Sequence, residues 1–217
     1  MSTADRIGRV HVLTDECIQS RYSHSELAVL AARGGAHRVQ YREKRLISRE
    51  ICTMTLVEIQ RSLSGYDTRL IVDDRVQEAF DARAFGVHLG PDDMPASEAR
   101  KLLGPDAVIG VTANNLEAAQ SLADEPVDYL GVGPVFRTGS KENPAPPLGL
   151  TGLRRIASAV TLPIVAIGGI HAGNAAAVLA AGAFGVAVLS AVACAADPEN
   201  ATRAIVEAVA GEVTHDG

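Results

Sequence analysis

The chain alternates short runs of aliphatic, β-branched residues with stretches of helical spacing, and it does so eight times. The runs that we expect to form strands are residues 10–14, 38–42, 69–73, 86–89, 108–112, 129–133, 163–168 and 185–190. Regular alternation of strands and helices indicates a parallel sheet covered by helices. Because eight such strands can close on themselves, the pattern predicts an α/β fold of the (β/α)8 TIM-barrel type, with an open doubly wound sheet as the alternative.

Chain length and composition agree with this fold. We expect residues 1–217 to form a single TIM-barrel domain, near the short end of the range for such barrels. Hydrophobic residues make up 47% of the chain, whereas aromatic residues make up 4% and tryptophan is absent. The core must therefore be built mainly from aliphatic side chains, which suits strands buried on both faces. Glycines at Gly35, Gly104 and Gly182 fall where helices are expected to end.

Charge and cysteine content exclude several classes of protein. The net charge of −6 argues against a broad surface for nucleic acid or anionic membranes. Three cysteines without a CxxC spacing argue against a disulfide framework or a structural zinc site and favour a reducing compartment. The sequence shows neither a signal peptide nor a membrane-spanning run. We therefore expect a cytoplasmic protein without nucleic-acid or membrane partners, and a homo-oligomer stays open.

Charged residues follow several of the expected strands, and the carboxyl ends of barrel strands converge on one rim. Arg42, Lys44 and Lys141 lie in different loops and can face one anion. Arginine can bind phosphate oxygens through bidentate hydrogen bonds, and lysine acts as a point charge. Asp74 and Asp93 supply the oxygen ligands that Mg2+ prefers when it also binds water and phosphate. This combination predicts a site for a diphosphate that acts as a leaving group.

A second phosphate site is expected near Gly168-Gly169 and Ser190, where backbone N–H groups lie at predicted helix starts. Each single residue also has an ordinary explanation. Asp74 can cap a helix, Asp93 can cap a turn, and the glycines can serve only a tight turn. The functional hypothesis depends on the joint placement of these residues at strand ends.

The chain also resembles the thiamine phosphate synthase family over nearly its whole length. The motifs that carry the resemblance are QYREK (40–44), VDDR (72–75), GVHLG (86–90), DDMP (92–95), GVGPVF (131–136), TGSK (138–141) and IGGI (167–170). The resemblance implies a TIM barrel that joins 4-amino-2-methyl-5-hydroxymethylpyrimidine diphosphate to 4-methyl-5-(2-phosphoethyl)thiazole. Diphosphate would leave first, and the thiazole nitrogen would attack the resulting pyrimidine methylene cation.

The resemblance also implies roles for individual residues. The diphosphate would be held by Arg42, Lys44 and Lys141, and Mg2+ by Asp74 and Asp93. Contacts to the aminopyrimidine would come from Gln40 and Thr112, with Asp73 beside the substrate. The thiazole and its phosphate would be held by Thr138, Ser140, Gly169, Leu189 and Ser190. No nucleophile–base pair is evident among these residues, and a dissociative substitution needs none.

Four positions depart from the family pattern. Asp73 replaces the usual Asn and adds a negative charge near the diphosphate, as an extra metal ligand or as a cause of weaker substrate binding. His11 stands where Tyr is usual, which alters packing beside the pyrimidine. Arg137 replaces the usual Pro, and Thr112 stands where Ser is common.

Three other functions stay open. The related thiazole tautomerases carry a catalytic His where this chain has Pro134, and they tend to lose the diphosphate and metal residues that are present here. A non-catalytic paralogue that binds thiamine precursors is compatible with Asp73 and His11. An unrelated phosphosugar isomerase or epimerase would need an acid–base pair, for which His88 with Asp73 is available.

Overall fold

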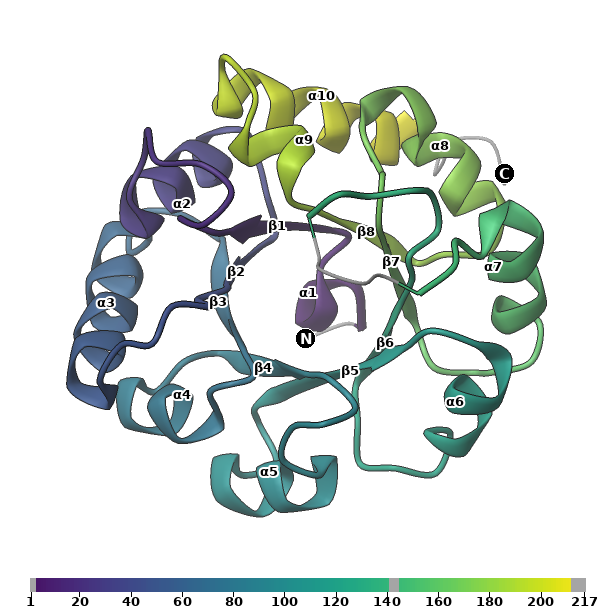
Figure 1. Ribbon diagram of the computed structural model, residues 1–217, viewed down its shortest axis with the longest axis horizontal. Helices are drawn as coiled ribbons and strands as arrows, with labels where there is room; N and C mark the ends of the chain where they lie inside the picture. The colour runs from purple at the N-terminus through teal and green to yellow at the C-terminus, as the bar shows by residue number, and fades with distance from the viewer. Residues whose placement is uncertain (1–2, 141–144, 212–217) are drawn as a thin grey trace.

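The computed structural model describes residues 3–140 and 145–211, and its strands form one closed barrel surrounded by helices (Figure 1). The strands are β1 (Val10–Thr14), β2 (Arg38–Tyr41), β3 (Arg69–Asp73), β4 (Gly86–Leu89), β5 (Val108–Ala113), β6 (Tyr129–Val132), β7 (Ile164–Ile167) and β8 (Gly185–Val188). Each strand pairs in parallel with the next, and β8 pairs with β1. The predicted (β/α)8 TIM barrel is therefore confirmed, and the open sheet is excluded.

The helices lie outside the ring of strands, with the exception of the first (Figure 1). They are α1 (Thr3–Ile7), α2 (His24–Arg33), α3 (Arg49–Ser62), α4 (Val76–Ala82), α5 (Ala96–Leu103), α6 (Leu116–Ser121), α7 (Gly149–Ala157), α8 (Ala172–Ala180), α9 (Ser190–Ala193) and α10 (Pro198–Gly211). Within the described ranges, none of them combines the length and the apolar character needed to cross a bilayer.

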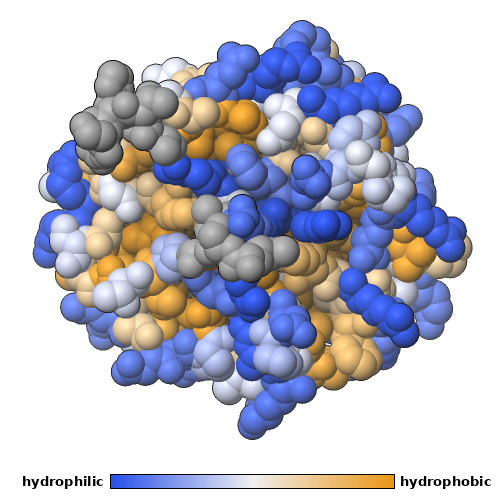
Figure 2. Space-filling model, turned by 180° about the vertical axis from the view of Figure 1, so that it is seen from behind, coloured by the Kyte–Doolittle hydropathy of each residue, from blue (hydrophilic) through white to orange (hydrophobic). Residues whose placement is uncertain are grey.

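Helix α1 covers the amino-terminal end of the barrel, a feature that the sequence pattern did not predict. Arg38 on β2 donates to the backbone carbonyl of Arg6 at 2.7 Å, and Arg6 Nε binds Asp128 Oδ1 at 3.0 Å. Arg100 Nη2 binds the other oxygen of Asp128 at 2.7 Å. The face turned away from the viewer of Figure 1 carries both hydrophilic and apolar areas (Figure 2). In barrels of this kind conserved structure at that end serves stability, whereas chemistry takes place at the opposite rim.

The core is aliphatic, as the composition predicts, and it has two parts. Outward-facing strand residues pack against the helices in a continuous layer that includes Val12, Val39, Leu130 and Val186. A smaller cluster fills the lower interior of the barrel: Ile7, Leu13, Ile71, Val108, Tyr129, Val165 and Ala187. Above this cluster the interior of the barrel opens into a cavity that is lined by polar side chains such as Gln40, Asp73 and Thr112.

Gly110 and Gly131 make room for two aromatic rings inside the barrel. A Cβ at Gly110 would lie 2.1 Å from Tyr129 Cζ, and a Cβ at Gly131 would lie 2.5 Å from His88 Cε1. The rings of Tyr129 and His88 stack with their centroids 5.6 Å apart. The two glycines therefore allow a polar aromatic floor beneath the rim, where larger residues would have closed the space.

Candidate active site

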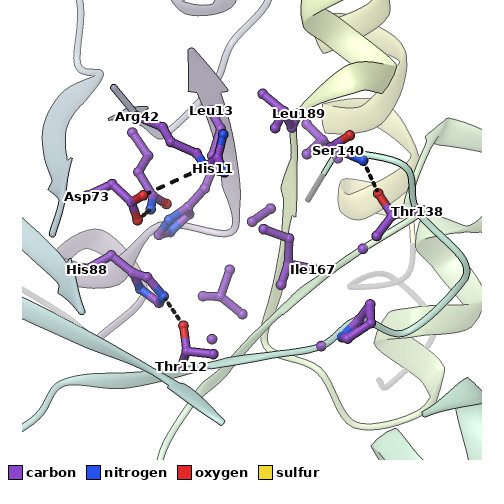
Figure 3. A pocket seen from close by; sticks show the side chains of 18 of the residues that line it. His11, Leu13, Arg42, Asp73, His88, Thr112, Thr138, Ser140, Ile167 and Leu189 are labelled. Atoms are coloured by element: carbon purple, nitrogen blue, oxygen red, sulfur yellow. Dashed lines mark hydrogen bonds and ion pairs between the residues drawn. The ribbon is translucent and has the colours of Figure 1, made fainter. Parts of the chain in front are cut away.

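A cavity of about 420 Å³ opens above this floor, at the carboxyl ends of the strands (Figure 3). Most of the predicted site residues line it: Gln40, Arg42, Lys44, Asp73, Asp74, Thr112, Thr138, Ser140, Gly169, Leu189 and Ser190. Of the two others, Asp93 lies beside the cavity, and Lys141 lies outside the described residues. Residues that are far apart in the sequence thus meet at one mouth.

Arg42 is held at the cavity by acidic residues from neighbouring strands. Its guanidinium forms an ion pair with Asp15, whose side chain is completely buried after β1. Arg42 Nε lies 3.9 Å from Asp73 Oδ2. Asp15 also accepts a hydrogen bond from the Cys17 N–H at 2.7 Å. Sequence reasoning missed Asp15 as part of the site, although its position directly after a buried strand was a signal.

Asp73 links Lys44 to Gln40. Gln40 Nε2 donates to Asp73 Oδ1 at 2.8 Å, and Lys44 Nζ lies 3.5 Å from Asp73 Oδ2. Burial and the neighbouring charge of Asp74 raise the pKa of Asp73 to about 6. Because Asp73 takes the amide nitrogen of Gln40, the amide oxygen of Gln40 is left as an acceptor for a ligand.

Asp74 adopts a backbone conformation that is uncommon for residues other than glycine. Its φ is +65°, and its N–H donates to the carbonyl of His88 on β4 at 2.9 Å. Helix α4 begins at Val76 after Arg75, without a side-chain cap. The helix-cap explanation of Asp74 is therefore wrong. A left-handed Asp fixed by a neighbouring strand is typical of functional sites.

Asp93 lies next to Asp74. Asp93 Oδ2 accepts the Gly90 N–H at 2.6 Å, so the turn-capping explanation is correct for one of its oxygens. Burial and a hydrogen bond to Asp74 raise the pKa of Asp93. Although burial opposes it, the pKa of Asp74 is lowered by hydrogen bonds from Asp93 and Lys44. The two carboxyl groups therefore lie side by side, and each changes the pKa of the other.

A divalent cation fits this pair by its chemistry. Mg2+ is usually bound by one or two carboxylates, with water and substrate phosphate as its other ligands. In the part of the chain that the structure describes, no three His, Cys, Asp or Glu side chains group as ligands of one ion. The carboxylates of Asp74 and Asp93 can thus bind a cation whose remaining ligands are water and substrate phosphate. They do not form a complete set of protein ligands for the ion.

His88 forms hydrogen bonds through both ring nitrogens. Nδ1 lies 3.1 Å from the Tyr129 hydroxyl, and Nε2 lies 3.0 Å from Thr112 Oγ1. Burial lowers the pKa of His88 to about 4, so the ring is neutral. His88 therefore orients Thr112 towards the cavity, and its ring bonds to Tyr129 and Thr112 and not to Asp73 among the described contacts.

The opposite wall is formed by the loops after β6, β7 and β8. Thr138 Oγ1 accepts the Ser140 N–H at 3.3 Å. Gly169 has a φ of +66°, and a Cβ there would lie 2.6 Å from the carbonyl of Arg137. Glycine is therefore required for the turn, as its ordinary explanation states, and it also brings the β6 loop over the cavity. Helix α9 begins at Ser190 without a side-chain cap, which leaves backbone N–H groups at this wall.

His11 lines the cavity, although the sequence interpretation treated it only as a departure from a family pattern. It is completely buried, and its ring contacts that of Tyr129 edge-on at 5.5 Å between centroids. Burial and then the charge of Arg38 lower the pKa of His11 to about 3. The ring is therefore neutral in the folded protein at any pH near neutrality.

This lowered pKa predicts that His11 contributes to acid unfolding. The unfolded chain binds a proton at His11 below pH of about 6.5, whereas the folded chain does not until about pH 3. The associated stability is present above the unfolded pKa and is lost as pH falls. When the pH falls from 7 to 4.5, the free energy of unfolding should decrease in both proteins. We expect the decrease to be about 2 kcal/mol smaller in His11→Phe than in the wild type, as measured by urea titration. Equal losses would contradict the assignment.

Together, a closed (β/α)8 barrel and a rim cavity with cations beside carboxylates define an enzyme that binds phosphorylated small molecules. Residues 10–192 match the model of the family described as thiamine monophosphate synthase. The chain belongs to this family and is a transferase.

Individual relatives support the assignment. The chain is 47% identical over 188 residues to the thiamine-phosphate synthase of Moorella thermoacetica, covering 85% of this chain and 87% of that protein. It is 44% identical over 214 residues to that of Archaeoglobus fulgidus, covering 96% and 97%. Among solved structures, the thiamine phosphate pyrophosphorylase of Pyrococcus furiosus superposes with a TM-score of 0.86 at 34% identity and covers 98% of this chain and 100% of that chain.

Proposed function

We propose that the protein is a thiamine-phosphate synthase that joins aminopyrimidine diphosphate to thiazole phosphate and releases pyrophosphate. The observation that carries the proposal is the meeting of Arg42, Lys44 and Asp74 at one cavity, with Asp93 beside them. Cations and a carboxylate pair in one place suit a diphosphate that must leave with its electron pair.

Breaking the bond between the pyrimidine methylene and the diphosphate oxygen moves negative charge onto the leaving group. Arg42 and Lys44 would neutralise that charge, with Lys141 as a third cation from the β6 loop. Asp15 and Asp73 hold Arg42 in place before substrate binds, so little reorganisation is needed during the reaction. Asp74 and Asp93 would hold the Mg2+, which when bound supplies further positive charge to the diphosphate.

The pyrimidine methylene cation must be protected from water until the thiazole nitrogen attacks it. Leu13, Val165, Ile167 and Leu189 give the cavity an apolar wall between the two polar sides. This wall excludes water from the region where the two rings would meet. Gln40 and Thr112 would orient the aminopyrimidine, and Thr138, Ser140, Gly169, Leu189 and Ser190 would hold the thiazole and its phosphate.

The alternatives are less well supported. Pro134 lines the cavity at the position where a tautomerase would need its catalytic His. The diphosphate-side residues also converge, which a tautomerase would not require.

We also propose that the protein is cytoplasmic, because Cys17 and Cys194 are exposed free thiols, which a reducing compartment favours.

The test is incubation of the protein with both substrates and Mg2+, followed by mass spectrometry for thiamine phosphate. We expect product to form with Mg2+ and to fall to background when EDTA is in excess, with activity restored by added Mg2+. Full activity in EDTA would exclude the metal role. Binding of the substrates without product would favour the non-catalytic paralogue.

A further inference from the structure

Glu43 lies between two cations that face the cavity, but its own side chain is turned away from it. Arg42 and Lys44 line the cavity, whereas Glu43 does not. Successive side chains of this segment therefore face opposite sides. The side chain of Glu43 is only 1% exposed, so it is a buried carboxylate behind the rim, and the proposed reaction gives it no direct role.

The Glu43 carboxylate closes the loop after β2 by binding Arg45. Glu43 Oε1 accepts the backbone N–H of Arg45 at 2.8 Å and its Nε–H at 2.9 Å, and Oε2 also binds the guanidinium. Although burial opposes it, hydrogen bonds from Arg45 lower the pKa of Glu43 to about 2, so the carboxylate is charged. Within the described ranges, no backbone–backbone hydrogen bond holds residues 43–45. The path of this loop therefore depends on its side chains, with Glu43 at the centre.

A second carboxylate and a histidine complete a cluster behind the rim. Arg45 Nη2 lies 2.7 Å from Glu16 Oε2, and Glu16 Oε1 accepts the backbone N–H of His24 at 3.0 Å. The ring of His24 lies between Thr14 and Glu43, with Nδ1 2.7 Å from Thr14 Oγ1 and Nε2 3.5 Å from Glu43 Oε2. These contacts tie the loop after β2 to the end of β1 and the start of α2.

The loops after β1 and β2 also meet on the cavity side, where Arg42 pairs with Asp15. The segment that carries Arg42 and Lys44 is thus held from in front by Asp15 and from behind by Glu43. Resting on the proposed function, we propose that Glu43 is a positioning residue that holds Arg42 and Lys44 in the arrangement that binds the diphosphate. Cations that are fixed in advance need little reorganisation when charge develops on the leaving group.

The charge of Glu43 makes this role distinguishable from a purely electrostatic one. A carboxylate near a bound diphosphate repels it, so removal of the charge alone would tighten binding. Loss of the positioning role has the opposite sign. We expect Glu43→Gln to bind pyrophosphate with Mg2+ about 10-fold more weakly in calorimetric titrations, the equivalent of one charge-assisted hydrogen bond. Its affinity for 4-methyl-5-(2-phosphoethyl)thiazole, which the opposite wall would bind, should be unchanged.

Asp128→Asn is the matched control. Like Glu43, Asp128 accepts a backbone N–H, from Ile109 at 2.8 Å, and binds arginine side chains, Arg6 and Arg100. It does so at the amino-terminal end of the barrel, away from the cavity. Both variants should lower the free energy of unfolding in urea, but Asp128→Asn should keep wild-type pyrophosphate affinity. Equal weakening in both variants, or wild-type or tighter binding in Glu43→Gln, would overturn the positioning role.

A second variant covers the case in which Glu43→Gln does not fold. The side chain of Glu16 is 24% exposed, so Glu16→Gln disturbs the interior less. It also removes negative charge, and we expect about 3-fold weaker pyrophosphate binding because Arg45 is held less firmly. Wild-type or tighter binding here would overturn the positioning role, and formation of thiamine phosphate by the wild type would leave the proposed function intact. A wild type that binds no pyrophosphate and makes no product would overturn both.

Discussion

Replacing Asp93 by alanine is expected to reduce pyrophosphate release to near background. We expect kcat/KM for the pyrimidine diphosphate to fall by about 100- to 1000-fold. The physical reason is that the carboxyl groups of Asp74 and Asp93 lie side by side, since each changes the pKa of the other, and together they would hold the Mg2+. Without Asp93 the proposed metal site would lose one of its two carboxylates, and charge on the departing diphosphate would be less well neutralised. Lys141→Ala is expected to have the same effect, because the family resemblance assigns this lysine to the diphosphate.

The control for Asp93 is its neighbour Asp92, which is exposed on the same loop. Asp92→Ala should retain full activity, which separates the loss of one ligand from a general loss of negative charge. Circular dichroism should show an intact barrel in all three variants, because Asp92 is exposed and Asp93 accepts a single backbone hydrogen bond, from Gly90, among the described residues. Wild-type turnover in both Asp93→Ala and Lys141→Ala would defeat the site assignment.

Replacing Arg42 by alanine is expected to remove both activity and stability. Arg42 is the ion-pair partner of Asp15, whose side chain is completely buried, so the substitution leaves an unpaired charge in the interior. Breaking a buried pair in this way costs about 3–5 kcal/mol. We expect a loss of about 3 kcal/mol in unfolding free energy, measured by urea unfolding, together with a loss of turnover.

A double variant separates the two effects. Adding Asp15→Asn to Arg42→Ala removes the unpaired charge and keeps an oxygen for the Cys17 N–H. Most of the stability should return, whereas activity should not, because the diphosphate still lacks its arginine. If the double variant were as unstable as the single one, the ion pair would not be the cause.

The strand pattern was predictable because it depends on local sequence. The starts of β1 to β6 and of β8 match the prediction, and β7 begins one residue later than expected. Several strands end one or two residues earlier, because the residues after them, such as Arg42 and Gly133, turn into rim loops. Helix α1 was missed, because five residues before β1 carry too little periodicity to indicate a helix.

The convergence of the site followed from one rule, that barrel strands end at one rim. The pairings within the site did not follow from the sequence. Gln40 meets Asp73 and Arg42 meets Asp15 because neighbouring strands have a particular register and rim loops a particular path. The tautomer of the neutral His11 ring depends on helix α1 and the residue after it, because Nε2 lies 3.0 Å from the carbonyl oxygen of Ile7 and 3.2 Å from that of Gly8 and must donate to them. Such partners are set by the closed barrel and not by sequence spacing.

We propose above that the diphosphate and its metal ion are held between Arg42, Lys44 and the Asp74–Asp93 pair. The most direct measurement is a crystal structure of the protein with pyrophosphate and Mn2+ in place of Mg2+, in which anomalous scattering locates the metal. We expect one manganese peak bound by Asp74 and Asp93, with the pyrophosphate contacting Arg42 and Lys44. A metal peak away from both carboxylates, or pyrophosphate bound outside the rim cavity, would contradict it.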